Sequence, residues 1–247
     1  MLMRYEKYRF SAKEGLLFTL EYMAVGGLIA YLFYDSIYLF ILLFTGFIPF
    51  LKKKKSQLII KRKKELSVQF QEAIAAAATA LSAGCSAENA FREAFKDMQR
   101  LYGEDSMIVK ELALLLQHLS FNGTLEAFLS EFAERSGIED IKDFSSIFTA
   151  AKRNGGNFSR IIQRNVDIMH TKQEIEQEIE VLLSGKRYEQ KIMSIIPLAI
   201  IGYLRYSTNE FSKVLYHNAA GIFGMSFCLA VYAAAYLLSE RIAAIEV

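Results

Sequence analysis

The stretch A-A-K-R-N-G-G-N-F-S-R-I-I-Q-R, residues 150–164, decides how the middle of this chain folds. A helical pattern runs into Asn154, two glycines interrupt it, and Asn157 opens a second helical pattern. Gly155 and Gly156 can adopt positive φ without a steric penalty, which suits the end of a helix. The side-chain oxygen of Asn157 can accept a hydrogen bond from a free N–H at the next helix start. The stretch therefore predicts the turn of a helical hairpin.

Two earlier breaks in the helical pattern have the same order of residues. Gly84 precedes Ser86 in the first, and Gly123 precedes Thr124 in the second. Each break has a glycine at a helix end, then Ser, Thr or Asn as the expected N-cap, then apolar residues one turn later. The three breaks indicate a weak internal repeat of helical hairpins, with periods of 39 and about 33 residues. Coincidence is the alternative, because glycine ends many helices.

The middle of the chain is predicted to be helical and acidic. It contains no proline, and its apolar residues recur at helical spacing. The six expected helices cover residues 66–83, 87–102, 107–121, 125–136, 138–154 and 158–185. Residues 65–191 hold 20 Asp and Glu against 14 Lys and Arg, a net charge of −6. An acidic body argues against nucleic acid as a partner, since binding to nucleic acid requires a basic surface.

The two ends of the chain are apolar. The 247 residues are 53% hydrophobic and 23% charged, and the apolar excess lies in the first 51 and the last 56 residues. Four apolar segments, residues 15–34, 37–51, 192–206 and 219–238, form two predicted transmembrane hairpins. A signal peptide is the competing interpretation of the first segment, but a second apolar segment follows at once with no A-x-A-like cleavage site between them.

The distribution of basic residues predicts the membrane topology. Lys and Arg lie before the first segment and in clusters at 52–55 and 61–64, which the positive-inside rule places in the cytoplasm. We therefore expect an all-α protein of the plasma (inner) membrane with both termini cytoplasmic. Its three domains are an N-terminal transmembrane hairpin (1–51), a cytoplasmic antiparallel bundle of about six helices (52–191) and a C-terminal transmembrane hairpin (192–247). Binding of anionic lipid or nucleic acid is an alternative role for the basic clusters.

The sequence contains none of the motifs expected of an enzyme or a metal site. It has no G-x-x-x-x-G-K-[ST] loop, no H-E-x-x-H and no G-x-S-x-G, and its two cysteines are not expected to pair. We expect no catalytic residue, cofactor or metal. The candidates for partner contact are Lys152 and Arg153, beside the third break, and Glu21 in the first apolar segment. Glu21 lies either within the hydrocarbon or, if the span begins later, at its inner interface.

Several short motifs, in order, resemble the helical domain of the type II secretion F family. They are Leu81-Ser82-Ala83-Gly84-Cys85-Ser86 with Ala90-Phe91, Asn122-Gly123-Thr124 with Glu126-Ala127-Phe128, Phe132-Ala133-Glu134-Arg135, Gly155-Gly156-Asn157 and Ile195-Ile196-Pro197. They cover roughly residues 65–200. A single such domain between two membrane hairpins is similar to the Tad (tight-adherence) platform proteins TadB and TadC.

The resemblance implies a non-enzymatic platform that couples a cytoplasmic secretion ATPase to pilin subunits in a type IV pilus-like or type II secretion-like machine. The implied partners are the ATPase, pilin-like subunits, a second platform protein and the lipid bilayer, within a homo- or hetero-oligomer. Two other classes of protein remain open. One is a small multi-span transporter or channel that uses Glu21, and the other is a membrane-anchored helical scaffold unrelated to pili.

Overall fold

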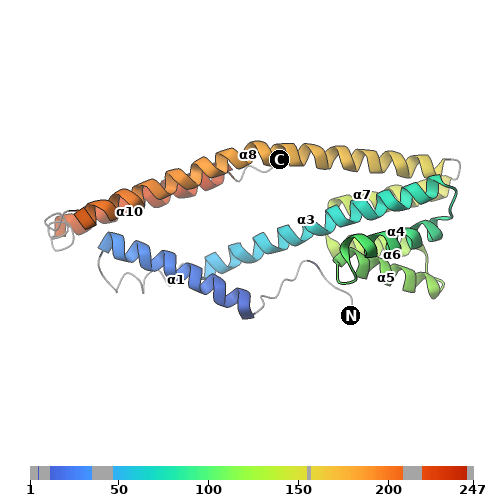
Figure 1. Cartoon of the computed structure of the whole chain (residues 1–247), viewed down its shortest axis with the longest axis horizontal. Helices are drawn as coiled ribbons and strands as arrows, with labels where there is room; N and C mark the ends of the chain where they lie inside the picture. Colours follow the sequence, from blue (N-terminus) through green and yellow to red (C-terminus); the bar gives the residue numbers. More distant parts are fainter. Residues whose placement is uncertain (1–4, 6–11, 35–46, 155–156, 208–218, 244–247) are drawn as a thin grey trace. The chain divides into compact units, whose positions relative to one another are not determined.

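The computed structural model describes residue 5 and residues 12–34, 47–154, 157–207 and 219–243. This part of the chain is helical and contains no strand, which confirms the predicted all-α class for it (Figure 1). The helices are α1 (Ala12–Tyr34), α3 (Phe47–Ser82), α4 (Ala87–Tyr102), α5 (Met107–Ser120), α6 (Leu125–Ser136), α7 (Glu139–Asn154), α8 (Phe158–Ser207) and α10 (Ala219–Ala243).

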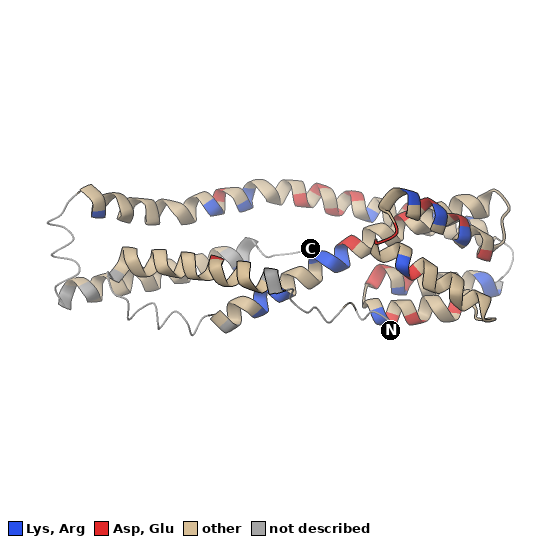
Figure 2. Cartoon of the chain, turned by 60° about the horizontal axis from the view of Figure 1, so that its bottom comes forward, with Lys and Arg blue, Asp and Glu red and all other residues tan. Residues whose placement is uncertain are grey.

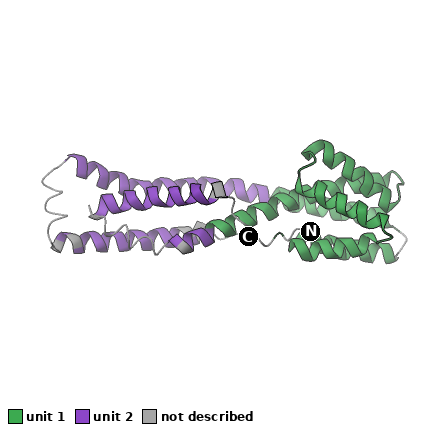
Figure 3. Ribbon diagram, turned by 90° about the horizontal axis from the view of Figure 1, so that it is seen from below, with its two compact units in different colours: residues 1–9, 54–175 green, residues 10–53, 176–247 purple. Residues whose placement is uncertain are grey.

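The chain divides into two compact units (Figure 3). Unit 1 contains Met1–Arg9 and Lys54–Ile175, and unit 2 contains Phe10–Lys53 and Glu176–Val247. Unit 1 therefore holds α4 to α7 together with most of α3 and the first part of α8. Unit 2 holds α1, α10 and the remaining parts of α3 and α8.

The short helices begin and end close to the predicted residues. α4 and α6 have the predicted bounds, and α5 and α7 each differ by one residue at one end. Local chemistry explains the agreement at two helix starts. Ser86 accepts a hydrogen bond from the backbone N–H of Asn89, and Thr124 accepts one from Ala127.

The two long helices differ from the prediction. α3 is continuous from Phe47 through both lysine clusters, because lysine is a good helix former and the charges can remain in solvent. α8 continues through Gly185 and Pro197 to Ser207, well beyond the end predicted at residue 185. The predicted domain boundaries after residues 51 and 191 therefore fall inside helices. Parts of three predicted features lie outside the described residues. They are the turn at 35–36, residues 37–46 of the second predicted span and residues 208–218 of the predicted loop.

Aromatic rings in edge-on and tilted contact form the centre of unit 1. Phe148 lies with its ring centroid 6.0 Å from Phe91, 5.8 Å from Phe144 and 5.2 Å from Phe158. Phe144 in turn lies 5.5 Å from Phe70. These rings come from α3, α4, α7 and α8, so one chain of edge-on and tilted contacts joins four helices.

A half-buried carboxylate joins three helices of unit 1. Asp140, in the first turn of α7, accepts hydrogen bonds from Lys172 of α8 at 2.7 Å and from Ser67 of α3 at 2.8 Å. Burial alone would raise the pKa of Asp140, but these hydrogen bonds outweigh it and lower the pKa below its usual value. The contact fixes the start of α7 against two helices that are distant in sequence.

Unit 2 exposes much of its apolar surface. Leu32, Phe33 and Met225 form its small buried cluster. Within the described residues, one helical stretch is long and apolar enough to cross a bilayer, Gly15–Phe33 of α1, and a shorter apolar stretch is Phe223–Ser239 of α10. Figure 2 shows long uncharged stretches in both helices. Of the four predicted spans, one meets the criterion of length and composition in this part of the chain.

Candidate functional site

Two cross-helix contacts show that the three predicted turns lie at one end of unit 1. Ser82, at the end of α3, lies with its hydroxyl 3.2 Å from that of Ser159 near the start of α8. Lys152, near the end of α7, forms an ion pair of 2.9 Å with Glu126 at the start of α6. We call residues 83–86, 121–124 and Asn157 the turn face.

Other contacts define the opposite end of unit 1. Tyr102 at the end of α4 donates a hydrogen bond to Glu72 at 2.7 Å, and Glu72 lies ten residues before the end of α3. The backbone N–H of Ile108, near the start of α5, donates to Gln69 at 3.2 Å. The turn face is therefore at the end remote from Lys54 and Ile175, the first and last residues of the main segment of this unit.

The first turn of the turn face ends α3 with a glycine in the left-handed region. Gly84 has φ 92°, and the backbone N–H of Cys85 donates to the carbonyl of Ala80 at 3.1 Å. This i to i−5 hydrogen bond is the mark of a Schellman motif, which satisfies a carbonyl at the helix end. Gly84 and Ser86 therefore have the backbone roles that the sequence predicted for them, the helix stop and the N-cap.

In the second turn the glycine has a different role from the one predicted. Asn122, with φ 60°, occupies the left-handed position. The backbone N–H of Gly123 donates to the backbone carbonyl of His118 at 3.0 Å. Asn122 therefore corresponds to Gly84, and the structural spacing of the two turns is 38 residues instead of the 39 between their glycines. Gly123 is needed for a different reason, because a β-carbon there would lie 2.2 Å from the His118 ring.

Replacing Gly123 by alanine should therefore destabilise the chain through its contact with His118. We expect Gly123→Ala to lower the free energy of unfolding by about 1–3 kcal/mol, since the ring must move away from its packed position. In a His118→Ala background the same change should cost much less. Gly84→Ala is the control, because nothing lies within 4 Å of its β-carbon position and its cost comes from positive φ alone. Urea unfolding of the full chain measures all four variants, and an equal cost in both backgrounds would contradict the prediction.

The third turn is described at one of its predicted residues. Gly155 and Gly156 lie outside the described residues. Asn157 is exposed, and its backbone carbonyl accepts from the N–H of Ile161 at 3.0 Å, in the first turn of α8.

Two of the three candidate contact residues, Lys152 and Arg153, belong to unit 1, and the third, Glu21, belongs to unit 2. The Lys152–Glu126 ion pair is partly exposed, and its hydrogen bond lowers the pKa of Glu126 despite the opposing effect of burial. Arg153 is exposed next to it. Glu21 is an exposed residue of α1 and belongs to unit 2, so it is not part of the turn face.

An apolar residue that the sequence reasoning passed over is prominent on the turn face. Phe121, the residue that ends α5, is 78% exposed. It directly precedes the left-handed Asn122, and its exposure means that its ring is not part of the aromatic centre of the unit.

A buried charge cluster is the second feature that sequence reasoning missed. Glu111 of α5 is 2% exposed and makes two hydrogen bonds with Arg135 of α6, at 3.1 and 2.8 Å. Tyr5 is 1% exposed and donates its hydroxyl to the same carboxylate at 2.8 Å. A glutamate beside Leu112 and Leu115 was the available signal, because a charge on an apolar helix face needs a partner.

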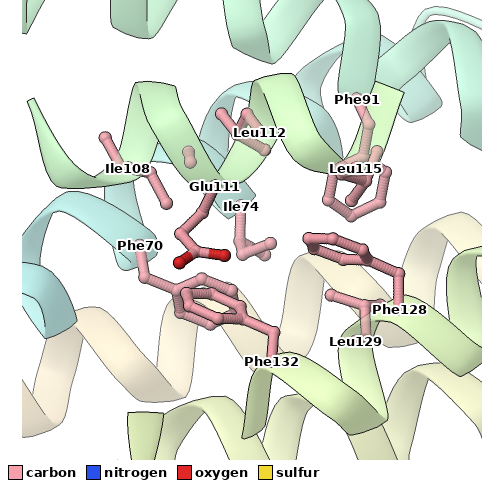
Figure 4. Close-up of a pocket in the computed structure, with 11 residues that line it drawn as sticks. Phe70, Ile74, Phe91, Ile108, Glu111, Leu112, Leu115, Phe128, Leu129 and Phe132 are labelled. Atoms are coloured by element: carbon pink, nitrogen blue, oxygen red, sulfur yellow. The ribbon is translucent and has the colours of Figure 1, made fainter. Parts of the chain in front are cut away.

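The Glu111 carboxylate borders a small apolar cavity. Figure 4 shows it pointing toward the side lined by Phe70 and Phe132. The cavity volume is about 10 Å³, close to the minimum for a single water molecule. The described residues include no group of three or more His, Cys, Asp or Glu that could hold a metal ion. This cavity cannot hold a substrate, and the glutamate serves the packing of α5 against α6.

Comparison with known proteins found no matching family model, no matching curated protein and no matching solved structure.

Proposed function

We propose that this chain is a non-enzymatic platform protein of the type II secretion F family, most similar to the Tad platform proteins. In this proposal it couples a cytoplasmic secretion ATPase to pilin-like subunits at the inner membrane. The observation that carries the proposal is that two similar hairpin turns, at residues 83–86 and 121–124, and the start of α8 lie at one end of unit 1. Both of these turns belong to the ordered motifs that resemble the family. Each has a Schellman-type helix end followed by a capping Ser or Thr.

Exposed apolar side chains of unit 2 support a membrane location. Large side chains on three helices are more than 60% exposed, and lipid would cover them. They are Leu16, Leu17 and Leu20 of α1, Met193, Ile195 and Tyr203 of α8, and Phe223, Phe227, Leu237 and Leu238 of α10. With the four predicted spans, this surface supports a multi-pass protein whose basic flanks keep unit 1 and both termini in the cytoplasm.

The turn face is the proposed docking surface for the ATPase. It lies at the end of unit 1 remote from the segments that lead into the apolar unit. Phe121 supplies an exposed aromatic side chain, and Arg153 supplies an exposed charge beside the third turn. A central aromatic residue with polar surroundings is the usual composition of an energetically important contact.

Affinity purification of the full chain from detergent extracts tests the proposal. The chain should recover a secretion ATPase, pilin-like subunits or a second platform protein. Phe121→Asp should reduce recovery of the ATPase at least about tenfold, the effect of losing a contact worth about 1.4 kcal/mol. The matched control is Leu101→Asp, because Leu101 is also exposed, at 62%, but lies at the opposite end of unit 1.

Two results would count against the proposal. Recovery of none of these partners under conditions that preserve such complexes would contradict the platform function. Recovery of the ATPase that falls equally with Phe121→Asp and Leu101→Asp would contradict the turn face as its docking surface, while leaving the platform function in place.

A further inference from the structure

α8 remains helical through a proline and a serine that both weaken the same turn. Pro197 has no backbone N–H, so the carbonyl of Met193, four residues earlier, loses its helical hydrogen bond. The hydroxyl of Ser194 donates to the backbone carbonyl of Gln190 at 2.8 Å. Such a side-chain bond to the preceding turn often bends a helix. A proline and a serine within one turn therefore mark a place where α8 can bend.

After Pro197, α8 is packed against α1 and α10. Leu198 and Ile201 pack against the small buried cluster that these two helices contribute to unit 2. The guanidinium of Arg205 lies 3.8 Å from the centre of the Tyr31 ring. It also donates a hydrogen bond to the backbone carbonyl of Tyr31, in the last turn of α1. A cation that binds a carbonyl at a helix end is favourably placed, so these contacts hold this end of α8 firmly.

Before Pro197, the large apolar side chains of α8 are exposed. They are Ile192, Met193, Ile195 and Ile196. The helix on this side of the proline therefore has less packing to hold it than the helix on the other side. If the turn bends, this is the arm of α8 that moves.

A hydroxyl group of α10 contacts the weakened turn on its less packed side. Tyr232 donates to the backbone carbonyl of Ser194 at 2.8 Å, in a partly buried position. A carbonyl oxygen has two lone pairs, so it can accept this bond together with the helical bond from the N–H of Leu198. Loss of the Tyr232 bond leaves the Ser194 carbonyl with its helical partner. The contact can therefore open and close at modest cost.

We propose that Ser194 and Pro197 form a hinge in α8, and that the Tyr232 hydroxyl is the latch that holds this hinge in the conformation described. When the latch opens, the arm before the hinge tilts against α10 while the arm after it stays packed. The hinge, the latch and the helices that they join belong to unit 2. The inference needs neither an ATPase nor pilins, so it stands independently of the proposed function.

Distances between pairs of spin labels on the full chain in detergent test the latch. One pair joins Tyr188→Cys, on the arm before the hinge, to Phe227→Cys on α10. The control pair joins Tyr203→Cys, on the packed arm, to the same position of α10. All three side chains are exposed, so labels there disturb little packing. Cys85→Ser and Cys228→Ser remove the two native thiols, which are also exposed.

Tyr232→Phe should add a second distance to the first pair, with a population about fivefold above that of the unmodified chain, the effect of losing one hydrogen bond. In a Pro197→Ala background the first pair should keep one distance with or without Tyr232→Phe. Alanine restores the N–H that binds the Met193 carbonyl and so removes the weak point. Tyr236→Phe is the matched control, because it removes the same group one turn further along α10, and it should leave the distances unchanged.

Four results would overturn the proposal. The first is an unchanged distance in Tyr232→Phe, and the second is an equal change in Tyr236→Phe. The third is an equal change in the Pro197→Ala background, which would show that the proline is not the hinge. The fourth is a matching change in the control pair, which would show general loosening of the packed helices instead of bending at one turn.

Discussion

Replacing Arg135 by methionine should lower the free energy of unfolding by about 3–5 kcal/mol, one of the two largest effects we expect in this protein. The substitution keeps the length of the side chain but leaves the Glu111 carboxylate, 2% exposed, without its counter-charge. Both Glu111 oxygens accept from Arg135, at 3.1 and 2.8 Å, so two charged hydrogen bonds disappear together. Urea unfolding of the full chain in detergent, followed by circular dichroism, measures the loss.

Two further variants separate burial from charge as the cause. The double substitution Glu111→Leu and Arg135→Met should recover most of the lost stability, because an apolar pair replaces a broken ion pair. Lys152→Met breaks the partly exposed ion pair with Glu126 and should cost at most about 1 kcal/mol. Losses of similar size from Arg135→Met and Lys152→Met would contradict the assignment of Glu111 to a buried, Arg135-dependent position.

Replacing Phe148 by alanine should lower the free energy of unfolding by about 3–5 kcal/mol. Phe148 is fully buried, and its ring contacts those of Phe91, Phe144 and Phe158. Removing it leaves a cavity where rings from three other positions meet, and these rings are held by helices that cannot collapse together without losing other contacts. The expected loss includes both the transfer free energy of the ring and the cost of this cavity.

Phe121→Ala is the control for the aromatic centre, because it removes the same side chain from a position that is 78% exposed. It should change the free energy of unfolding by no more than about 0.5 kcal/mol. The same urea titration measures both variants. A loss for Phe121→Ala as large as that for Phe148→Ala would show that Phe121 packs inside the protein and would remove it from the proposed docking surface.

The helix ends with local signals could be predicted from the sequence. The bounds of α4 and α6 match because the caps Ser86 and Thr124 act on N–H groups three residues away. The left-handed residue at the end of α3 was predictable for a similar reason, since glycine is the residue that adopts φ 92° most easily. The sequence alone did not show that Asn122 instead of Gly123 takes the left-handed position at the next turn, because both glycine and asparagine can adopt positive φ there.

The candidate site depended more on tertiary structure. The sequence identified the turn residues, but it gave no sign that Phe121 is exposed while Phe128, seven residues later, is buried. It also treated Lys152 as a contact residue, and the structure pairs this lysine with Glu126, 26 residues away. Such pairings follow from how helices are placed against each other, which no short window of sequence contains.

The sequence by itself determined the helical class, the short helices and the capped turns, because hydrogen bonds within a few residues set each of them. Tertiary structure decided the length of α3 and α8, the gathering of the turns on one face and the cluster of Tyr5, Glu111 and Arg135. Tyr5 and Glu111 are 106 residues apart, and each needs the other only once packing has removed water from both. Burial makes the charge of Glu111 depend on its contacts with Arg135 and Tyr5, and burial is a property of the folded chain.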